Sequence, residues 1–224
     1  MTSRTYGQFC GLAHAMELIG ERWALLVIRD LLSGPKRFTD LRNGLPRIPT
    51  NILSARLKEL EGSGVIQRRL LPRPQGSVVY ELTDYGRELE DVVLRLGLWG
   101  ARTLGQPRPD DVVTTDSLLI ALRTTYRSDA ARGLHLRYEL RVGDIAVHAR
   151  IDDGALEVAP GPAADPDLVI ETGPELRALL AGVIGPSEAV AGGSVQLSGD
   201  PKLLERFLAV FHVPPPPSAI SASA

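Results

Sequence analysis

The sequence has a single cysteine, few aromatic residues and no long apolar run. Cys10 alone can form neither an internal disulfide framework nor the usual cysteine-based zinc sites. Aromatic residues make up 5% of the 224 residues, so leucine, valine and alanine must fill the core. No apolar run approaches the roughly 18 residues of a membrane-spanning helix, and the first residues lack the regions of a signal peptide. We therefore expect a cytoplasmic protein with no membrane partner.

The residue patterns that carry catalysis or hold metals and cofactors are missing too. The sequence has no glycine-rich phosphate loop, nucleophile elbow or Ser/His/Asp arrangement. Its four histidines are scattered, and no cysteine or acid clusters with them at the spacing of metal ligands. His135 and His148 are the two that a hairpin could bring together. We expect no catalytic residue, no metal, no cofactor and no enzyme activity.

Charge is divided unevenly along the chain. Residues 1–105 hold 15 Lys/Arg against 11 Asp/Glu, whereas residues 106–224 hold 10 against 16. The excess of cations is concentrated in residues 35–73, which hold 9 Lys/Arg against 3 Asp/Glu. Such a split predicts a domain that faces nucleic acid, joined to a domain that does not.

Residues 34–84 have the pattern of a winged helix-turn-helix. A short helix around Phe38 ends at a Gly-Leu-Pro turn, and a second helix begins at Pro49, a residue suited to a first helical position. Two predicted strands, 65–71 and 78–82, follow around a basic tip rich in proline and glycine. This order of elements presents one helix to the DNA major groove.

The second of these helices carries the residues that we expect to read DNA. Leucines recur along its inner stripe, and the opposite stripe holds small hydrogen-bonding groups and a cation, whereas an ordinary solvated face, the alternative, usually carries Glu/Lys pairs. Asn51 is the expected base reader, because its amide can pair with adenine. Nearby cations are expected to contact phosphates or the minor groove. The residues predicted to contact DNA are Lys36, Arg37, Arg47, Thr50, Asn51, Ser54, Lys58 and Arg73. Arg56 lies nearer the buried side and is expected to form a structural ion pair, and at most one of Arg68 and Arg69 can face DNA.

Apolar residues outside this motif predict a dimer. Thr83 is expected to cap a helix that runs to about Leu104 and carries apolar residues at alternate spacings of four and three, beginning at Tyr85. A seam of this length at the edge of a small domain needs a partner surface, which we expect to be a second subunit. A helix over residues 9–19 adds further apolar side chains. The predicted dimerisation residues are Phe9, Leu12, Met16, Leu89, Val92, Leu96 and Trp99.

After a linker at 105–111, the second half has the pattern of an α+β domain. Gly143-Asp144 and Asp153-Gly154 are hairpin signals between runs that alternate apolar and polar residues. Strands are expected at 134–142, 145–151, 156–158, 168–171 and 195–197, and helices around 118–122, 174–184 and 201–213. The fold class is therefore α+β: a winged helix-turn-helix domain over 1–104, then a domain over 112–213 with a mostly antiparallel five-stranded sheet. A disordered tail is expected at 214–224.

The first half resembles the HxlR family of winged-helix regulators. The matching stretches are Cys10 and residues 18–32, 34–41, 46–64 and 80–86, in family order over about 95 residues. The resemblance implies a homodimer whose terminal helices pair and whose two recognition helices enter successive major grooves. The family often has Cys-Pro where this chain has Cys10-Gly11, and often has serine where Pro49 stands.

Two interpretations of Cys10 are open. It could be a small, buried apolar residue. It could also be a thiol sensor, because a helix N-terminus lowers thiol pKa values and some members of the family respond to oxidants or electrophiles through a cysteine near this place.

The second half is similar to the sterol carrier protein type 2 domain. The likeness lies in the order of the strands and in residues 165–170, 180–182 and 197–203, and it implies an apolar tunnel for lipid-like molecules. Each apolar residue here could equally be plain core, but a domain with many leucines and few aromatics could also leave a cavity. The residues predicted to line it are Leu119, Leu122, Leu179, Val183, Phe207, Leu208 and Phe211.

Together these patterns predict a homodimeric, DNA-binding transcriptional repressor that is controlled by a hydrophobic small molecule. Its operator on double-stranded DNA should be a pseudo-palindrome. One alternative is a constitutive or cysteine-sensing regulator whose second half is only structural. The other is a lipid carrier, which the missing catalytic residues and the cations of residues 35–73 disfavour.

Overall fold

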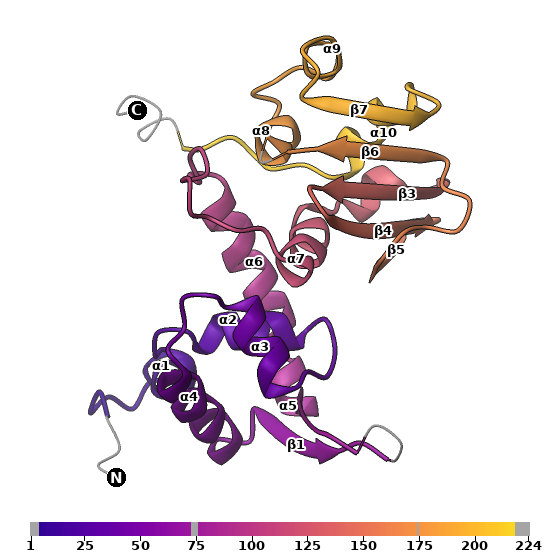
Figure 1. Cartoon of the computed structure of the whole chain (residues 1–224). Helices are drawn as coiled ribbons and strands as arrows, with labels where there is room; N and C mark the ends of the chain where they lie inside the picture. The colour runs from indigo at the N-terminus through magenta and orange to yellow at the C-terminus, as the bar shows by residue number, and fades with distance from the viewer. Residues whose placement is uncertain (1–4, 73–75, 174, 218–224) are drawn as a thin grey trace. The chain divides into compact units, whose positions relative to one another are not determined.

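The structure is a computed structural model that describes residues 5–72, 76–173 and 175–217 (Figure 1). Its contacts divide the chain into two compact units, Met1–Val93 and Leu94–Ala224. The division falls inside helix α6 (Glu90–Ala101), upstream of the linker that the sequence predicts at 105–111. The predicted domain boundaries stay predictions, and each unit has a hydrophobic core of its own.

Four helices form most of the first unit. They are α1 (Gly11–Ile19), α2 (Ala24–Leu31), α3 (Phe38–Gly44) and α4 (Thr50–Gly62). Helix α2 is buried along most of its length, which fits its largely apolar sequence. Leu53, Leu57 and Leu60 recur at helical spacing on α4, and all three are buried in the same core. The opposite stripe of α4 therefore faces solvent.

The wing is a two-stranded antiparallel sheet. Strands β1 (Ile66–Leu70) and β2 (Val78–Leu82) pair in register from Ile66 opposite Leu82 to Leu70 opposite Val78. The loop before α3 is fastened to this sheet, because the backbone amide and carbonyl of Lys36 both bond Tyr80, at 2.9 and 2.7 Å. The wing and the helix-turn-helix thus share one hydrogen-bonded framework, and the order of their elements is the one that the sequence predicts.

One helix was expected from Thr83 to about Leu104, but the chain forms two. The hydroxyl oxygen of Thr83 accepts a hydrogen bond from the amide of Gly86 at 3.0 Å and so caps α5 (Asp84–Arg87). Helix α6 begins three residues after α5 ends. Between the two, Leu89 packs against the core of the first unit, which separates it from the exposed apolar residues of α6. The prediction of one continuous seam is therefore wrong at this point.

A five-stranded sheet in the order β5-β4-β3-β6-β7 organises the second unit. The strands are β3 (His135–Val142), β4 (Ile145–Asp152), β5 (Ala155–Pro160), β6 (Leu168–Thr172) and β7 (Val195–Gly199). Only β3 and β6 pair in parallel, so the sheet is mostly antiparallel, as predicted. The β4–β5 turn takes positive φ at both Asp153 (48°) and Gly154 (85°), which explains the Asp-Gly pair found there.

Helices cover one face of this sheet. They are α7 (Thr115–Thr125), α8 (Leu176–Leu180) and α10 (Leu203–Val210), whose buried side chains join one core with those of the strands. Phe207 lies at the centre of this core, with ring centroids 5.2 Å from Tyr138 and 4.7 Å from Phe211. A short 3-10 helix η1 (Ser128–Ala131) and helix α9 (Pro186–Ala191) complete the unit. The sequence predicted neither of these two, and it predicted longer spans for α8 and α10.

Candidate nucleic-acid interface

Helix α4 presents a polar face that contains no large apolar side chain. Pro49 precedes the helix in extended backbone (φ −64°, ψ 140°), so the first helical residue is Thr50, one residue later than predicted. Thr50, Asn51, Ser54 and Lys58 are all exposed, on the side away from the leucine stripe. The hydroxyl of Ser54 donates to the carbonyl of Thr50 at 3.0 Å, which leaves its oxygen as an acceptor toward solvent. The four residues predicted for this face thus share it.

Three of the predicted phosphate contacts lie around the helix-turn-helix. Arg47 is exposed in the loop before α4, and Arg37 is exposed at the start of α3, where its amide donates to Asp40 at 2.8 Å. The Lys36 side chain is half-buried beside the wing. Arg73, predicted at the wing tip, lies outside the described residues. That these side chains contact DNA stays a prediction.

Arg56 is a structural ion-pair former, as predicted. Its Nη1 lies 2.6 Å from Oε2 of Glu59 and 3.4 Å from Oε2 of Glu21, and its side chain is only 12% exposed. The ion pairs tie α4 to the turn before α2. Arg56 therefore does not belong to the exposed face of α4.

The two wing arginines are held by acids of the protein. Nε of Arg68 lies 2.8 Å from Glu61, which raises the pKa of Arg68, and Nε of Arg69 lies 2.9 Å from Glu81. Glu81 also accepts from Gln67 at 3.0 Å and is 8% exposed. Burial alone would raise the pKa of Glu81, but the bonds from Gln67 and Arg69 outweigh it and hold this pKa below its usual value. Sequence reasoning missed Glu81, and its only signal was a lone acid in an apolar strand.

Apolar side chains lie exposed on α1 and α6. Phe9 and Leu12 are open to solvent, and Met16 is at the margin of exposure. Val92, Leu96 and Trp99 follow one another at spacings of four and three along α6, and Leu96 and Trp99 are 47% and 69% exposed. Of the seven predicted dimerisation residues, Leu89 is the exception, because it packs inside its own unit.

Cys10 is exposed just before the first turn of α1, so its interpretation as a buried apolar residue is wrong for this chain. The backbone amides of Ala13 and Leu12 lower the pKa of its thiol. Free amides at the start of a helix favour the thiolate because they place partial positive charge beside the sulfur.

The residues predicted to line a ligand cavity in the second unit are mostly packed core. Five of them, Leu119, Leu122, Leu179, Phe207 and Phe211, are buried members of one hydrophobic cluster. Leu208 is partly buried against that cluster, whereas Val183 is 68% exposed and lines no interior. The many leucines thus fill the space between sheet and helices instead of lining a tunnel there.

Hollows on the second unit lie elsewhere, and charged side chains contribute to the lining of each. One of about 250 Å³ and another of about 390 Å³ both include Arg137 and Arg150, which face each other across β3 and β4. A third, of about 450 Å³, lies where β6 ends and β7 begins and includes Arg141 and Glu171. None of the three contains a residue that was predicted to line the apolar tunnel.

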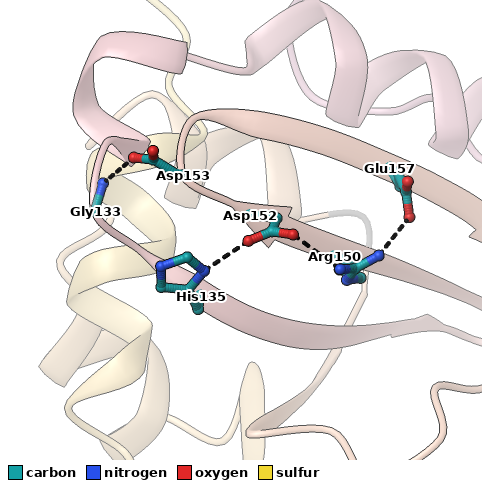
Figure 2. Close-up of polar contacts among 6 residues, drawn as sticks. All are labelled: Gly133, His135, Arg150, Asp152, Asp153 and Glu157. Atoms are coloured by element: carbon teal, nitrogen blue, oxygen red, sulfur yellow. Dashed lines mark hydrogen bonds and ion pairs between the residues drawn. The ribbon is translucent and has the colours of Figure 1, made fainter.

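Figure 2 shows the ionic contacts that surround Arg150 on the sheet face away from the helices. Asp152 bridges His135 and Arg150, with contacts of 2.6 and 2.9 Å, and Arg150 reaches Glu157 on β5 at 3.3 Å. The carboxylate of Asp153 accepts the amide of Gly133 at 2.8 Å. His148 pairs instead with Glu139 in the strand register, so the two histidines that a hairpin could have joined stay apart.

Within residues 5–72, 76–173 and 175–217, no group of three or more His, Cys, Asp or Glu side chains is placed to hold a metal ion. In the same ranges no helix is both long and apolar enough to cross a membrane.

Comparison with known proteins places the first half. Residues 18–108 match the family model for the HxlR-like helix-turn-helix. The HTH-type transcriptional regulator YodB of Bacillus subtilis (strain 168) is 39% identical over 85 residues, which cover 38% of this chain and 76% of YodB. The chain belongs to the HxlR-like helix-turn-helix family. An uncharacterized HTH-type transcriptional regulator of the same organism, YdeP, is 36% identical over 93 residues, 42% of this chain and 73% of YdeP.

A solved structure of the redox regulator HypR in its oxidized form is 31% identical and covers 43% of this chain and 99% of its own, with a TM-score of 0.41. The second half matches a different model. Residues 111–220 match the family described as alkyl sulfatase C-terminal. The likeness to sterol carrier protein type 2 stays a prediction.

Proposed function

We propose that this chain is a homodimeric, sequence-specific DNA-binding transcriptional regulator, and specifically a repressor. The observation that carries the proposal is the exposed face of α4, where Thr50, Asn51, Ser54 and Lys58 stand opposite a fully buried leucine stripe. Membership of a helix-turn-helix family, whose curated relatives are named as transcriptional regulators, supports it.

In the proposed complex α4 lies in the major groove. The Asn51 side chain can donate its amide N–H to N7 of an adenine and accept from the N6 amino group through Oδ1, the bidentate contact that reads one base. Ser54 offers its hydroxyl oxygen as an acceptor. Lys58, Arg47, Arg37 and Lys36 contribute phosphate contacts that set the register of the helix on the duplex. Because Arg68 and Arg69 are held by Glu61 and Glu81, the wing contributes less charge than its sequence suggests.

The exposed apolar residues of α1 and α6 are proposed as the dimer interface. In the dimer, a second copy of the chain covers Leu12, Leu96 and Trp99, which are exposed here. The removal of apolar surface from water is the main favourable contribution to the free energy of association. A two-fold dimer places two recognition helices about 34 Å apart, one turn of DNA. The operator is then a pseudo-palindrome.

The test is binding to the DNA upstream of the chain's own coding region, followed by fluorescence anisotropy. Asn51→Ala is expected to lower affinity by about 1–3 kcal/mol per half-site and to relax discrimination at one base pair of each. The matched control is Gln196→Ala, which removes another exposed amide from the second unit and should leave binding unchanged. Equal affinity of wild type and Asn51→Ala for every base at each position would overturn the assignment of α4.

The second half is proposed to sense a small molecule, with no enzymatic activity. Its match to a domain found at the C-terminus of alkyl sulfatases makes amphipathic alkyl compounds the first ligands to try. A ligand that binds the folded state raises its melting temperature by the free energy RT ln(1 + [L]/Kd). A screen in which no alkyl or lipid compound shifts the melting temperature would favour the alternative of a purely structural second half.

Cys10 supports a second route of control. An exposed thiol with a lowered pKa is more reactive toward oxidants than a buried one. Operator binding by the wild type should then weaken after treatment with diamide, whereas Cys10→Ser should bind equally with and without it. A wild type that is insensitive to the oxidant would end this idea.

A further inference from the structure

A hollow of about 350 Å³ lies on the first unit beside the N-terminal end of α4. It is bounded by the turn before α2 and by the loop that leads into the recognition helix. None of the sequence motifs accounts for it. Its lining combines an apolar floor with several cations, and this combination points to a class of ligand.

The floor is formed by Trp23, Pro49 and Ile52. Trp23 and Ile52 are partly buried and pack against the hydrophobic core of the unit, so the floor is continuous with that core. An apolar surface that includes an indole favours a ligand with a ring, which gains free energy by leaving water and by stacking on the indole.

The rim carries more positive than negative charge. Three guanidinium groups, those of Arg22, Arg47 and Arg56, line the hollow with the single carboxylate of Glu21. The Arg22 guanidinium lies over the Trp23 ring, 5.3 Å from its centroid. Arg56 is the buried member, and in the part of the chain that the structure describes its Nε has no hydrogen-bond partner. An acceptor group is therefore the natural complement of this rim.

Trp23 is held in an unusual backbone conformation. Its φ of +82° lies in the left-handed region, which a bulky aromatic residue rarely adopts. Such strain persists only where the surrounding structure over-determines it, and strained residues gather at ligand clamps and switches. Here the strained residue lines the hollow and stands directly before the first turn of α2.

From these observations we infer that the hollow is an effector site for a small aromatic carboxylate. The ring of the ligand lies on Trp23 and Ile52, and its carboxylate takes hydrogen bonds from Arg22 and Arg47. Arginine suits this task because its planar fork matches the two oxygens of a carboxylate. An isolated phosphate group, such as one from a DNA backbone, would meet the cations but gain nothing from the apolar floor.

The site also provides a means of control, and this step rests on the proposed DNA binding. Arg47 is one of the proposed phosphate contacts, so a carboxylate that engages it competes with DNA for the same guanidinium. The two ligands then weaken each other by an equal factor, as linkage requires. Filling the hollow would release the operator.

Calorimetric titration of the full chain without DNA tests the site. The probe is 1-naphthoate, compared with its neutral isostere 1-naphthamide and with inorganic phosphate. We expect one naphthoate to bind per chain. Both comparison compounds should bind at least about tenfold more weakly, because naphthamide lacks the charged carboxylate and phosphate lacks the ring. Arg22→Gln should weaken naphthoate about tenfold, whereas Arg42→Gln, an exposed arginine of α3 outside the hollow, should not. Trp23→Phe keeps a ring in place and should weaken naphthoate binding less than Arg22→Gln does.

The opposite results would overturn the inference. Absence of naphthoate binding, or equal binding by the wild type and Arg22→Gln, removes the site, and phosphate binding as tight as naphthoate assigns it to a DNA phosphate. Anisotropy with the upstream duplex then tests control: naphthoate should lower DNA affinity by the factor by which DNA lowers naphthoate affinity. Unchanged DNA affinity with naphthoate bound removes the control step alone. A chain that binds naphthoate but no DNA contradicts the proposed function and leaves the site standing.

Discussion

At the scale of single residues, the clearest departure from ordinary behaviour is Glu81. This carboxylate is buried on β2, and Gln67 and Arg69 of the facing strand hold it charged and lower its pKa. Because the folded-state pKa lies below the unfolded value, the bonded carboxylate stabilises the fold at pH values above about 4–5. That contribution is lost as the pH falls through the folded-state pKa.

We therefore predict a pH-dependent effect of Glu81→Gln. At pH 7 the variant should have a free energy of unfolding lower by about 1–3 kcal/mol, because it loses charge-assisted hydrogen bonds in a buried place. The deficit should shrink as acid protonates the wild-type carboxylate. Urea unfolding at pH 7 and at pH 3.5 measures both quantities. Glu157→Gln is the control, since Glu157 is largely exposed and its removal should matter little at either pH. A deficit that stays constant over this range would contradict the account.

Single residues were also where the sequence was least informative. Asn51, Ser54 and Lys58 were found because helical spacing alone places them opposite the leucines. Spacing could not tell that Val183 is exposed or that Phe207 is core, since both follow from how elements pack, and for the same reason it could not decide whether Cys10 is buried. The hollow at Trp23 had no linear signal, because three separate segments bring its lining together.

At the scale of elements, the wing and the start of α5 depend on one close approach. The backbone of Gly86 lies against the carbonyl oxygen of Val65, and a Cβ at this position would overlap that oxygen. The hydroxyl of Thr83 donates to the carbonyl oxygen of Gly64 at 2.6 Å and fastens the same junction. No side chain fits at Gly86 unless the strand and the helix move apart.

Gly86→Ala should therefore lower the stability of the first unit by about 2–4 kcal/mol, as overpacking against backbone does. Gly62→Ala is the matched control, because a Cβ there meets open space at the end of α4. That change should be neutral or stabilise by about 0.4–1 kcal/mol. Thermal and urea unfolding, followed by circular dichroism, measure the stability of both variants. A Gly86→Ala variant as stable as the wild type would show that the strand and the helix can move apart at little cost.

Helix α6 carries the second prediction at this scale. If its exposed face forms the dimer interface, Leu96→Glu places an unpaired charge in that interface. The dimer dissociation constant should then rise at least about 100-fold, which corresponds to about 3 kcal/mol. Val190→Glu is the control, because Val190 on α9 is similarly exposed, at 42% against 47%. Sedimentation equilibrium measures the constant, and a wild type that is monomeric at micromolar concentration would refute the dimer.

Elements were predicted well where a local rule decides them. The Asp-Gly turn, the alternating strands and the cap at Thr83 each rest on a few neighbouring residues, and each is present. The break between α5 and α6 was missed because Leu89, which lies between them, packs on the core of the first unit, a contact with distant segments that local spacing does not show. Helix α9 was missed because its six residues are too few for a helical pattern.

At the scale of the whole molecule, the excess of cations in the first half overstates the charge that can meet DNA, because some of these cations form ion pairs within the protein. Residues 35–73 hold nine cations, and Arg56, Arg68 and Arg69 are among those that form ion pairs with acids of the same unit. Lys58, Arg47, Arg37 and Lys36 are the cations of this segment that the proposal assigns to phosphates within the described residues. About three or four phosphates per subunit, hence six to eight per dimer, is then the number that this surface can neutralise.

This count fixes the salt dependence of operator binding. The logarithm of the binding constant should fall against the logarithm of salt concentration with a slope of about −5 to −7, because each neutralised phosphate releases its condensed counterion. Lys58→Ala removes one contact per subunit and should make the slope shallower by about 2, whereas Lys202→Ala on the second unit should leave it unchanged. Anisotropy titrations at potassium chloride concentrations from about 50 to about 300 mM give the slopes of the wild type and of both variants. A slope near half the expected one would mean that a single subunit engages DNA, and a flat dependence would mean that phosphates do not hold this protein on the duplex.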